Sequence, residues 1–168
     1  MKKIHLIRHA KSSWADISLS DIERPLNDRG ISTCRLMAEH IYKAGCIFDN
    51  VFSSPAVRAR STIEIIADCL EDMEITWETE EDLYTFSSDS LIEWCRNIDE
   101  SMSEIVMVGH NPAFTDFANR LGRSRIDNIP TCGYVQMQSE NECLWHEIPD
   151  APFKINTFLR PKKLIKDL

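Results

Sequence analysis

Short apolar runs alternate with amphipathic stretches along most of the chain. The runs are rich in β-branched residues, as buried strands are, and they cover residues 4–7, 51–52, 73–79 and 104–108. Between the runs, apolar residues recur at helical spacing behind capping residues. The expected helices, each named with its cap first, run from Asn27 to residue 44, from Ser54 to Leu70, from Ser87 or Ser88 to Asn97, and from Asn111 to Gly122. This alternation predicts a three-layer α/β sandwich with a mostly parallel central sheet.

The last quarter of the chain has a different pattern. Residues 133–138 and 143–148 are each typical of a strand, and the polar turn 139–142 joins them. We therefore expect a hairpin that gives the sheet an antiparallel edge. The tail 154–168 is basic, and we expect it to be only partly ordered. No repeat, low-complexity tract or linker interrupts the sequence, which predicts a single domain over residues 1–168.

Charge and cysteine content narrow the class of protein. The net charge of −8 at pH 7 argues against a general nucleic-acid binder, which would need a basic surface. The six cysteines form no Cys-x-x-Cys pair, which favours reduced, buried thiols over a zinc site. No apolar stretch has the length of a signal peptide or a membrane helix. We expect a cytoplasmic protein without nucleic-acid or membrane partners.

Cations and histidines follow three of the expected strands. They are Arg8 and His9 after the first strand, Arg58 after the second, and His110 after the fourth. Parallel strands end at one edge of a sheet, and α/β proteins bind their ligands at that edge. Because the arginine fork binds two oxygens at once, these residues predict a phosphate site.

The same residues can carry out phosphoryl transfer. A neutral histidine can attack phosphorus through a ring nitrogen, and neighbouring guanidinium groups favour the neutral form. Spacing alone leaves open whether His9 or His110 attacks. The chemistry requires neither metal nor cofactor. A metal-dependent phosphatase with both histidines as ligands is disfavoured, because the sequence contains no His-x-His or His-x-Asp pair.

Four motifs, in this order, resemble those of the histidine phosphatase (phosphoglycerate mutase-like) superfamily. They are Arg8-His9-Ala10-Lys11-Ser12-Ser13-Trp14, Pro25-Leu26-Asn27-Asp28-Arg29-Gly30, Ser53-Ser54-Pro55 with Arg58-Ala59, and Gly109-His110-Asn111. The resemblance implies a phosphoglycerate mutase-like fold with His9 as the phosphate-accepting nucleophile. The phosphate pocket that it implies consists of Arg8, Arg58 and His110, with lesser binding roles for Ser12 and Asn27.

The chain is also similar to the SixA-type branch of this superfamily, which removes phosphate from phosphohistidine on signalling proteins. The similarity lies in its short length and in the sequences Lys-Ser-Ser-Trp and Arg-Pro-Leu-Asn. It implies a metal-independent phosphatase that acts on a phosphorylated protein. Two alternatives stay open: a phosphatase of small phosphate esters with the same mechanism, and a phosphate-binding module without turnover.

Two positions depart from the superfamily pattern. Ala10 replaces the usual glycine, which the fold tolerates if the backbone there does not need a positive φ. The general acid of the mutase branch has no clean match. Glu81 is the candidate, with Glu80, Asp82 and Asp16 as rivals. A phosphorus–nitrogen bond needs less help from an acid than an alkyl ester does, so this gap fits a phosphohistidine substrate better.

Overall fold

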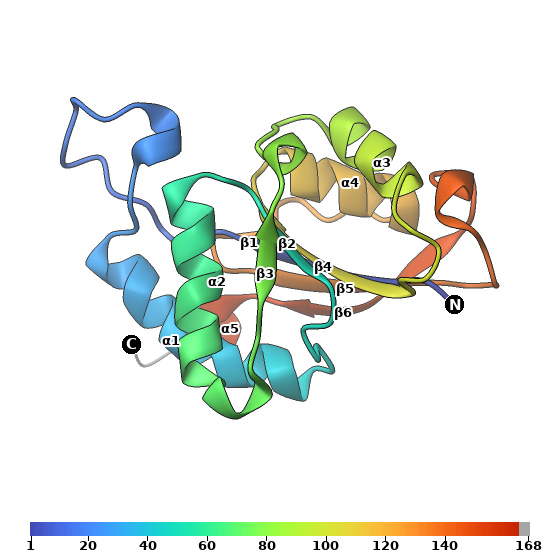
Figure 1. Ribbon diagram of the computed structural model, residues 1–168, viewed down its shortest axis with the longest axis horizontal. Helices are drawn as coiled ribbons and strands as arrows, with labels where there is room; N and C mark the ends of the chain where they lie inside the picture. The colour runs from blue at the N-terminus through green and yellow to red at the C-terminus, as the bar shows by residue number, and fades with distance from the viewer. Residues whose placement is uncertain (165–168) are drawn as a thin grey trace.

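A six-stranded sheet forms the centre of the protein in the computed structural model, which describes residues 1–164 (Figure 1). The strand order is β3-β2-β4-β1-β5-β6. The strands are β1 (Lys3–Arg8), β2 (Val51–Ser53), β3 (Trp77–Thr79), β4 (Glu104–Gly109), β5 (Tyr134–Ser139) and β6 (Phe153–Leu159). The first four are parallel to one another, whereas β5 pairs antiparallel with both β1 and β6. The predicted α/β sheet with an antiparallel edge is confirmed.

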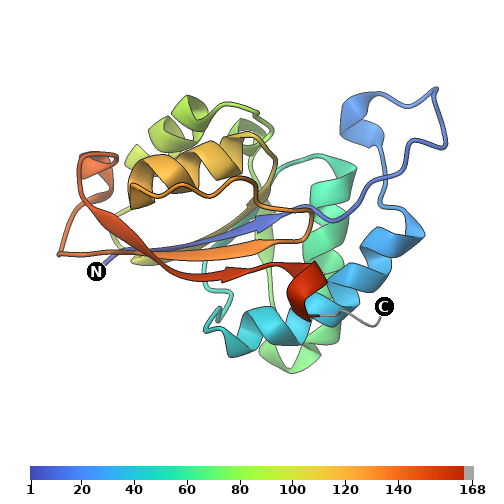
Figure 2. The same ribbon diagram turned by 180° about the vertical axis from the view of Figure 1, so that it is seen from behind.

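Helices cover both faces of this sheet. They are α1 (Asp28–Lys43), α2 (Val57–Cys69), α3 (Ser88–Arg96), α4 (Ala113–Gly122) and the short α5 (Pro161–Leu164). Figures 1 and 2 show α1 and α2 on one face and α3 and α4 on the other. Side chains alternate along β1, so Ile4 and Leu6 join the core under α3 and α4, while Ile7 joins the core under α1 and α2.

The helix starts follow the predicted caps with one clear exception. Asn27 caps α1 by accepting a hydrogen bond from the Gly30 N–H at 2.8 Å, and Ser87 caps α3. The cap predicted at Ser54 is wrong. α2 begins only at Val57, because Ser54 belongs to the turn that leaves β2 and its hydroxyl accepts from the Ala56 N–H.

The start of α4 also differs slightly from the prediction. This helix begins at Ala113 behind Pro112, so Asn111 lies one residue before the cap position. The Asn111 side chain still stabilises the first turn, because its Oδ1 accepts from the Thr115 N–H at 3.1 Å. The Asn111 side chain therefore pairs one of the free N–H groups at the start of α4, as a capping residue does, although it lies outside the helix.

The predicted partner of β5 is wrong. Residues 143–148 form no strand: they contain the 3₁₀ turn η4 (Trp145–Glu147), which buries Trp145 in the core. β5 pairs instead with β6, in the tail that we expected to be only partly ordered. β6 is an edge strand with mostly half-exposed side chains, so its sequence looks polar. Residues 165–168 of that tail lie outside the described residues.

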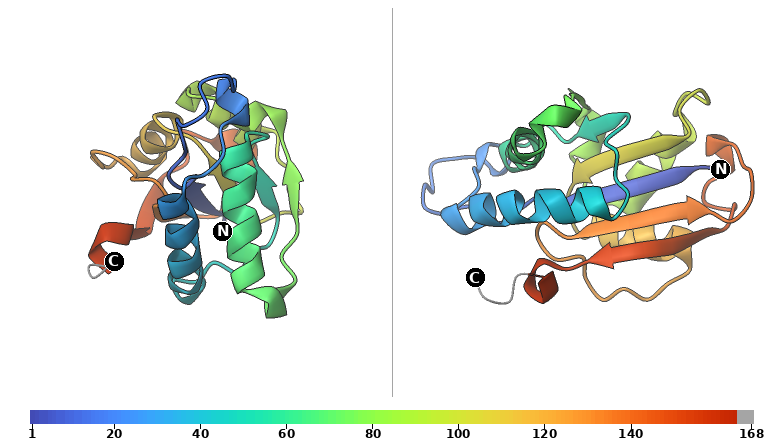
Figure 3. Two further views of the ribbon diagram at one scale, coloured as in Figure 1. Left: turned by 90° about the vertical axis from the view of Figure 1, so that its left-hand side faces the viewer. Right: turned by 90° about the horizontal axis from the view of Figure 1, so that it is seen from below.

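The strand order brings the predicted cations and histidines to one edge. β1 and β4 are neighbours in register, with Arg8 opposite Gly109, so the residues that follow them lie side by side. β2 lies on the other side of β4. Figure 3 shows the central position of β1, and the loop over residues 11–26 projects from the body at this edge.

Candidate active site

His9 lies directly after β1 and is 8% exposed. Its Nδ1 is 2.7 Å from the Ala10 carbonyl oxygen, to which only a protonated nitrogen can donate, so Nε2 carries the lone pair. Burial lowers the pKa of His9 to about 4, the positive charges of Arg58, Arg8 and Arg24 add to this effect, and the hydrogen bond to Ala10 opposes it. At neutral pH, His9 therefore offers an uncharged nucleophilic nitrogen.

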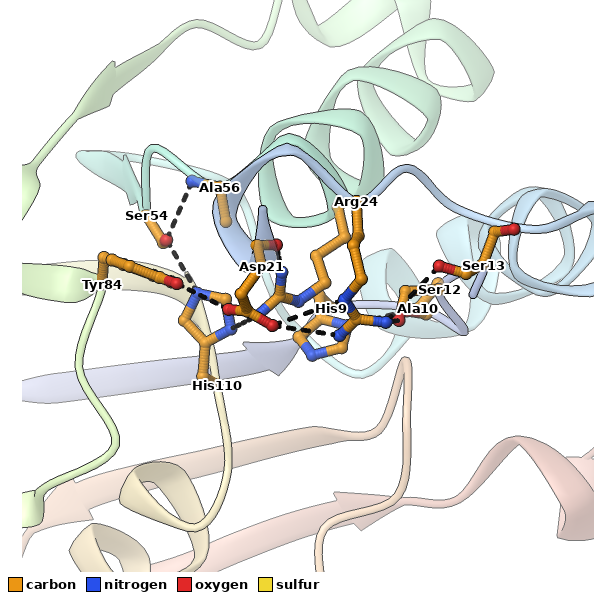
Figure 4. Close-up of polar contacts among 11 residues, drawn as sticks. His9, Ala10, Ser12, Ser13, Asp21, Arg24, Ser54, Ala56, Tyr84 and His110 are labelled. Atoms are coloured by element: carbon orange, nitrogen blue, oxygen red, sulfur yellow. Dashed lines mark hydrogen bonds and ion pairs between the residues drawn. The ribbon is translucent and has the colours of Figure 1, made fainter. Parts of the chain in front are cut away.

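His110 follows β4 and lies beside His9, with 5.2 Å between the two ring centroids. Its Nε2 is 2.7 Å from the Ser54 hydroxyl, which fixes the ring (Figure 4). Burial lowers the pKa of His110 to about 3, and the charges of His9 and Arg58 contribute in the same direction. In the resting site Nδ1 faces Arg58 Nη2, and because arginine can only donate, Nδ1 accepts and the Nε2–H donates to the Ser54 hydroxyl. A hydroxyl can also donate, so the other neutral tautomer, with Ser54 donating to Nε2, would present an Nδ1–H to a bound phosphate.

Arg8 and Arg58 supply the positive charge. Arg58 lies in the first turn of α2 and is 2% exposed, and Arg8 donates from Nη1 to the Ile129 carbonyl at 2.8 Å. The Nε atoms of both arginines are buried and have no hydrogen-bond partner among residues 1–164. Such donors are costly to leave unpaired, and two of them on guanidinium groups indicate a site for an oxyanion.

A cavity of about 380 Å³ lies at this edge of the sheet. Its lining includes three arginines, the nucleophile candidate and two further polar side chains: Arg8, Arg24, Arg58, His9, Ser12 and Asp21. His110 contacts Arg58 from behind, with its Nδ1 3.5 Å from Nη2. The structure thus brings together Arg8, His9, Arg58, His110 and Ser12, as the sequence predicted.

Two predicted site residues lie elsewhere. The Asn27 side chain serves as the cap of α1, and its Nδ2 lies 3.5 Å from the Ser12 carbonyl. Glu81 lines a separate cavity of about 730 Å³, which also contains its rival Asp82 and no arginine or histidine. The rival Asp16 accepts hydrogen bonds from Ser18. None of these carboxylates lines the cavity that holds His9.

Three charged residues that line the cavity were not predicted as site residues: Lys11, Asp21 and Arg24. Arg24 donates from Nη1 to the Ser12 hydroxyl at 2.9 Å and stacks on the Trp14 ring, 3.5 Å from its centroid. Asp21 forms an ion pair with Arg58, with 2.9 Å between Oδ2 and Nη2. All three come from the polar loop 11–26, where charged residues are ordinary, so only the Arg-Pro-Leu-Asn sequence could have indicated Arg24.

Small residues shape the loop that follows His9. The backbone at Ala10 does not take a positive φ, so alanine fits where the superfamily usually has glycine. The Ala10 N–H donates to Thr62 Oγ1 at 3.0 Å, which ties the loop to α2. At Gly30, a Cβ atom would lie 2.2 Å from the Lys11 carbonyl oxygen. Glycine therefore allows α1 to pack directly against this loop.

Within residues 1–164, no three side chains of His, Cys, Asp or Glu gather in a way that could hold a metal ion. None of the helices there combines the length and apolar character that crossing a membrane requires.

The chain belongs to the histidine phosphatase superfamily (branch 1). Residues 4–91, more than half of the sequence, match the sequence model of that family. This match confirms the superfamily predicted from the four motifs. It covers the first three of them and therefore includes Arg8, His9 and Arg58.

Similarity to curated proteins is modest. The chain is 27% identical over 146 residues to an uncharacterized chloroplastic protein from Arabidopsis thaliana, an alignment that covers 82% of this chain and 66% of the relative. It is 30% identical over 92 residues to a 2,3-bisphosphoglycerate-dependent phosphoglycerate mutase from Elusimicrobium minutum, covering 50% of this chain and 36% of the mutase. The chain thus spans less than two thirds of the length of these relatives.

Solved structures share the whole fold. The protein histidine phosphatase SixA in complex with tungstate superposes with a TM-score of 0.76 at 18% identity, covering 96% of this chain and 99% of SixA. A protein named SixA from Agrobacterium tumefaciens gives 0.76 at 21% identity, covering 95% and 98%. At these identities the likeness shows the fold, and it confirms the predicted phosphoglycerate mutase-like architecture.

Proposed function

We propose that this protein is a metal-independent phosphatase that forms a phosphohistidine at His9 and acts on phosphohistidine of a signalling protein. One observation carries the proposal. A neutral histidine with a free Nε2 shares a cavity with two arginines, Arg8 and Arg58, whose buried Nε atoms have no partner among the described residues. A phosphoryl group supplies both the acceptor oxygens and the electrophile that this arrangement fits.

The first step transfers the phosphoryl group. The lone pair on Nε2 of His9 attacks phosphorus, a new phosphorus–nitrogen bond forms, and the bond from phosphorus to the substrate nitrogen or oxygen breaks. The leaving atom takes the electron pair of that bond and gains a proton from water. Arg8 and Arg58 hold the negative charge of the equatorial oxygens, and His110 donates a further hydrogen bond.

The second step regenerates the protein. Water attacks the phosphorus bound to His9, the phosphorus–nitrogen bond breaks, and inorganic phosphate leaves while His9 returns to its neutral form. The hydrogen bond from Nδ1 to the Ala10 carbonyl stabilises the positive charge that the ring carries as a phosphohistidine. The same contact therefore supports both steps.

Two features favour a phosphohistidine substrate on a protein. Among residues 1–164, Asp21 is the one carboxylate that lines the cavity, and its pKa is about 2, so these residues supply no protonated acid for an alkoxide leaving group. The loop 11–26 also carries exposed apolar side chains: Trp14, which lines the cavity, is 73% exposed, and Ile17 is 96% exposed. A protein around the phosphorylated side chain can cover these residues, whereas a small ester cannot.

A phosphatase of small phosphate esters is the second candidate. The cavity of about 380 Å³ is large enough to enclose such an ester. A panel that compares a phosphohistidine protein with sugar and nucleotide phosphates separates the two candidates. We expect the highest kcat/KM for the phosphoprotein, and a higher value for any small ester would reverse the order.

The covalent intermediate gives the direct test of the reaction. The protein is mixed with labelled phosphoprotein and quenched in alkali, because phosphohistidine is stable in alkali and labile in acid. We expect label on His9, and turnover that chelators do not change. Phosphate binding without label or turnover would show a binding module. Loss of turnover with chelator would show a metal-dependent phosphatase.

We further propose that residues 1–168 form one domain that works in a reducing compartment, such as the cytoplasm. Six free cysteines, four of them buried, support this assignment, because an oxidising compartment favours disulfides. Imaging of the tagged protein tests the location, and limited proteolysis tests the domain.

A further inference from the structure

A carboxylate occupies the centre of the cationic cavity. Asp21 lies on the 3₁₀ turn η1 (Asp21–Glu23) in the loop 11–26, and its side chain is 44% exposed. It contacts Arg58, Arg24 and Tyr84, as the dashed lines in Figure 4 show for the residues drawn. A carboxylate would ordinarily be unfavourable in a pocket for phosphate, because like charges repel. Its contacts with the guanidinium groups indicate what it does there.

Arg58 depends on Asp21 for both of its terminal nitrogens. Nη1 donates to the Asp21 carbonyl at 2.6 Å, and Nη2 donates to Oδ2 at 2.9 Å. Arg58 is nearly fully buried in the first turn of α2, where a cation opposes the helix dipole and a buried charge needs a partner. Asp21 supplies that partner, while the Nε of Arg58 stays buried without a hydrogen-bond partner among residues 1–164.

The other carboxylate oxygen holds Arg24. Oδ1 lies 3.4 Å from Nε and 3.3 Å from Nη2 of that guanidinium. Arg24 reaches the cavity from the loop 11–26, where it is 8% exposed and its contacts are with other residues of that loop, Ser12 and Trp14. The two oxygens of one carboxylate therefore set the spacing of two arginines that come from different parts of the chain.

Tyr84 fixes the carboxylate from the side away from Arg24 (Figure 4). Its hydroxyl donates to Oδ2 of Asp21 at 2.5 Å, and its ring lies edge-on to His110 with 5.4 Å between centroids. Tyr84 directly follows the 3₁₀ turn η3 (Glu81–Leu83). The contact thus ties the loop 11–26 to a segment about 60 residues away along the chain.

We propose that Asp21 is a positioning residue that holds Arg58 and Arg24 together as one phosphate clamp, and that Tyr84 anchors it. The inference rests on the proposed function, since it assigns a role within the same cavity. Hydrogen bonds from Tyr84 and Arg58, with the charges of Arg58 and Arg24, outweigh the effect of desolvation and lower the pKa of Asp21 to about 2. The carboxylate is therefore ionised in the resting protein and acts through the arginines.

The test compares Asp21→Asn and Asp21→Ala with a matched control, Glu23→Gln. Glu23 lies on the same 3₁₀ turn and pairs only with Ser20 in its side-chain hydrogen bonds, so this variant removes an equal charge without touching either arginine. Binding of orthovanadate and of tungstate is measured by calorimetry, and kcat and KM are measured with p-nitrophenyl phosphate and phenyl phosphate. Thermal melts establish that each variant is folded.

We expect both Asp21 variants to bind the oxyanions about 10- to 100-fold more weakly, the scale for misplaced positioning groups, while Glu23→Gln binds like the wild type. Tyr84→Phe should weaken binding in the same direction and by less. The kcat/KM values for the two aryl esters should fall by equal factors, because positioning does not depend on the leaving group.

Two results would overturn the assignment. Tighter oxyanion binding by Asp21→Ala would show that the carboxylate competes with phosphate for the arginines. A loss that is much larger for phenyl phosphate, the ester with the poorer leaving group, would show that Asp21 acts as an acid. Because oxyanion binding needs no turnover, this test separates failure of the clamp from failure of the proposed reaction.

Discussion

Two groups of residues meet at the proposed phosphate site, and they are built differently. The strand-end cluster consists of Arg8, His9, Arg58 and His110, which follow buried strands. The loop cluster consists of Trp14, Asp21 and Arg24, which come from the loop 11–26. Arg58 and His110 are 2% and 1% exposed, whereas the Asp21 side chain is 44% and Trp14 73% exposed, and Arg24, at 8%, is the buried member of the loop cluster.

This difference suggests that the two clusters have different roles, one in the reaction and the other in binding the substrate. Side chains on packed strands and helices keep their geometry, which suits groups that must stabilise charge without reorganising. Side chains on a projecting loop can adapt to what binds, which suits groups that shape and cover the substrate. We therefore expect changes in the strand-end cluster to affect the reaction itself, and changes in the loop to affect binding and the choice of substrate.

Replacing His9 should have the largest effect of all. His9→Ala removes the proposed nucleophile, so turnover should fall by at least about 10⁴-fold, as it does when a covalent catalyst loses its nucleophile. Covalent labelling should disappear as well. The measurement is the rate of phosphate release together with the label retained after an alkaline quench.

His110→Ala is the matched comparison. His110 would hold phosphate and not carry it, so turnover should slow by about 10²- to 10³-fold, the scale for losing one preorganised donor, while some label stays on His9. Label on His110 in the wild type, or normal turnover in His9→Ala, would reverse the two roles.

Arg58 comes next in expected effect. Arg58→Ala should cost about 2–4 kcal/mol of transition-state stabilisation, since it removes a preorganised charge donor. Arg58→Lys keeps the charge and loses the fork, so it should recover only part of the loss. Vanadate inhibition and kcat/KM measure both variants. An inhibitor affinity that is unchanged in Arg8→Ala and Arg58→Ala would place the phosphate elsewhere.

The strand-end cluster could be predicted because its signals are local. Arg8, His9 and His110 lie at or just after the ends of apolar runs, and Arg58 lies in the first turn of the helix that follows the next run. The parallel order of the strands guarantees that their ends meet at one edge. Asp21 and Arg24 gave no comparable signal. Their position depends on how a 16-residue loop folds back over the cavity, which no periodicity in that loop specifies.

The fold shows the same limit at its other edge. The central strands β1 and β4 were predictable because both of their faces are buried and their sequences are mostly apolar, interrupted in β1 only by His5 between Ile4 and Ile7. β6 was missed because an edge strand needs few apolar residues, while residues 143–148 looked like a strand because Trp145 and Ile148 are core residues of an irregular segment. An apolar residue indicates only that a position is buried. The type of secondary structure can be predicted only where the buried positions recur at a regular spacing.

The depressed pKa values of the strand-end histidines give a prediction of intermediate size. The folded-state pKa is about 4 for His9 and about 3 for His110, below the ordinary value of 6.5. Between pH 6.5 and about 4, these two histidines bind more protons in the unfolded chain than in the folded protein. The free energy of unfolding should therefore fall as the pH drops through this range. NMR titration of the ring protons should show both histidines still neutral at pH 5.5. Titration near pH 6.5 would contradict the burial of the site.

The smallest effect is expected at Ile17 in the loop 11–26, which is 96% exposed and does not line the phosphate cavity. If a protein substrate contacts this loop, Ile17→Ser should raise KM for the phosphoprotein by roughly two- to fivefold, the scale of an ordinary interface contact. It should leave p-nitrophenyl phosphate hydrolysis unchanged. Trp14 is a poorer choice for this test, because its ring also supports Arg24.

Ile47→Ser provides the matched control for that experiment. Ile47 is 50% exposed in the segment that leads into β2, at the edge of the sheet opposite the cavity. Its replacement should therefore leave kcat/KM unchanged for both substrates. The decisive quantity in each variant is the kcat/KM for the phosphoprotein divided by the kcat/KM for p-nitrophenyl phosphate. An equal ratio in wild type, Ile17→Ser and Ile47→Ser would mean that the loop makes no contact with a protein substrate. A lower ratio in Ile17→Ser alone would make the projecting loop the part of the molecule that recognises the protein around the phosphoryl group.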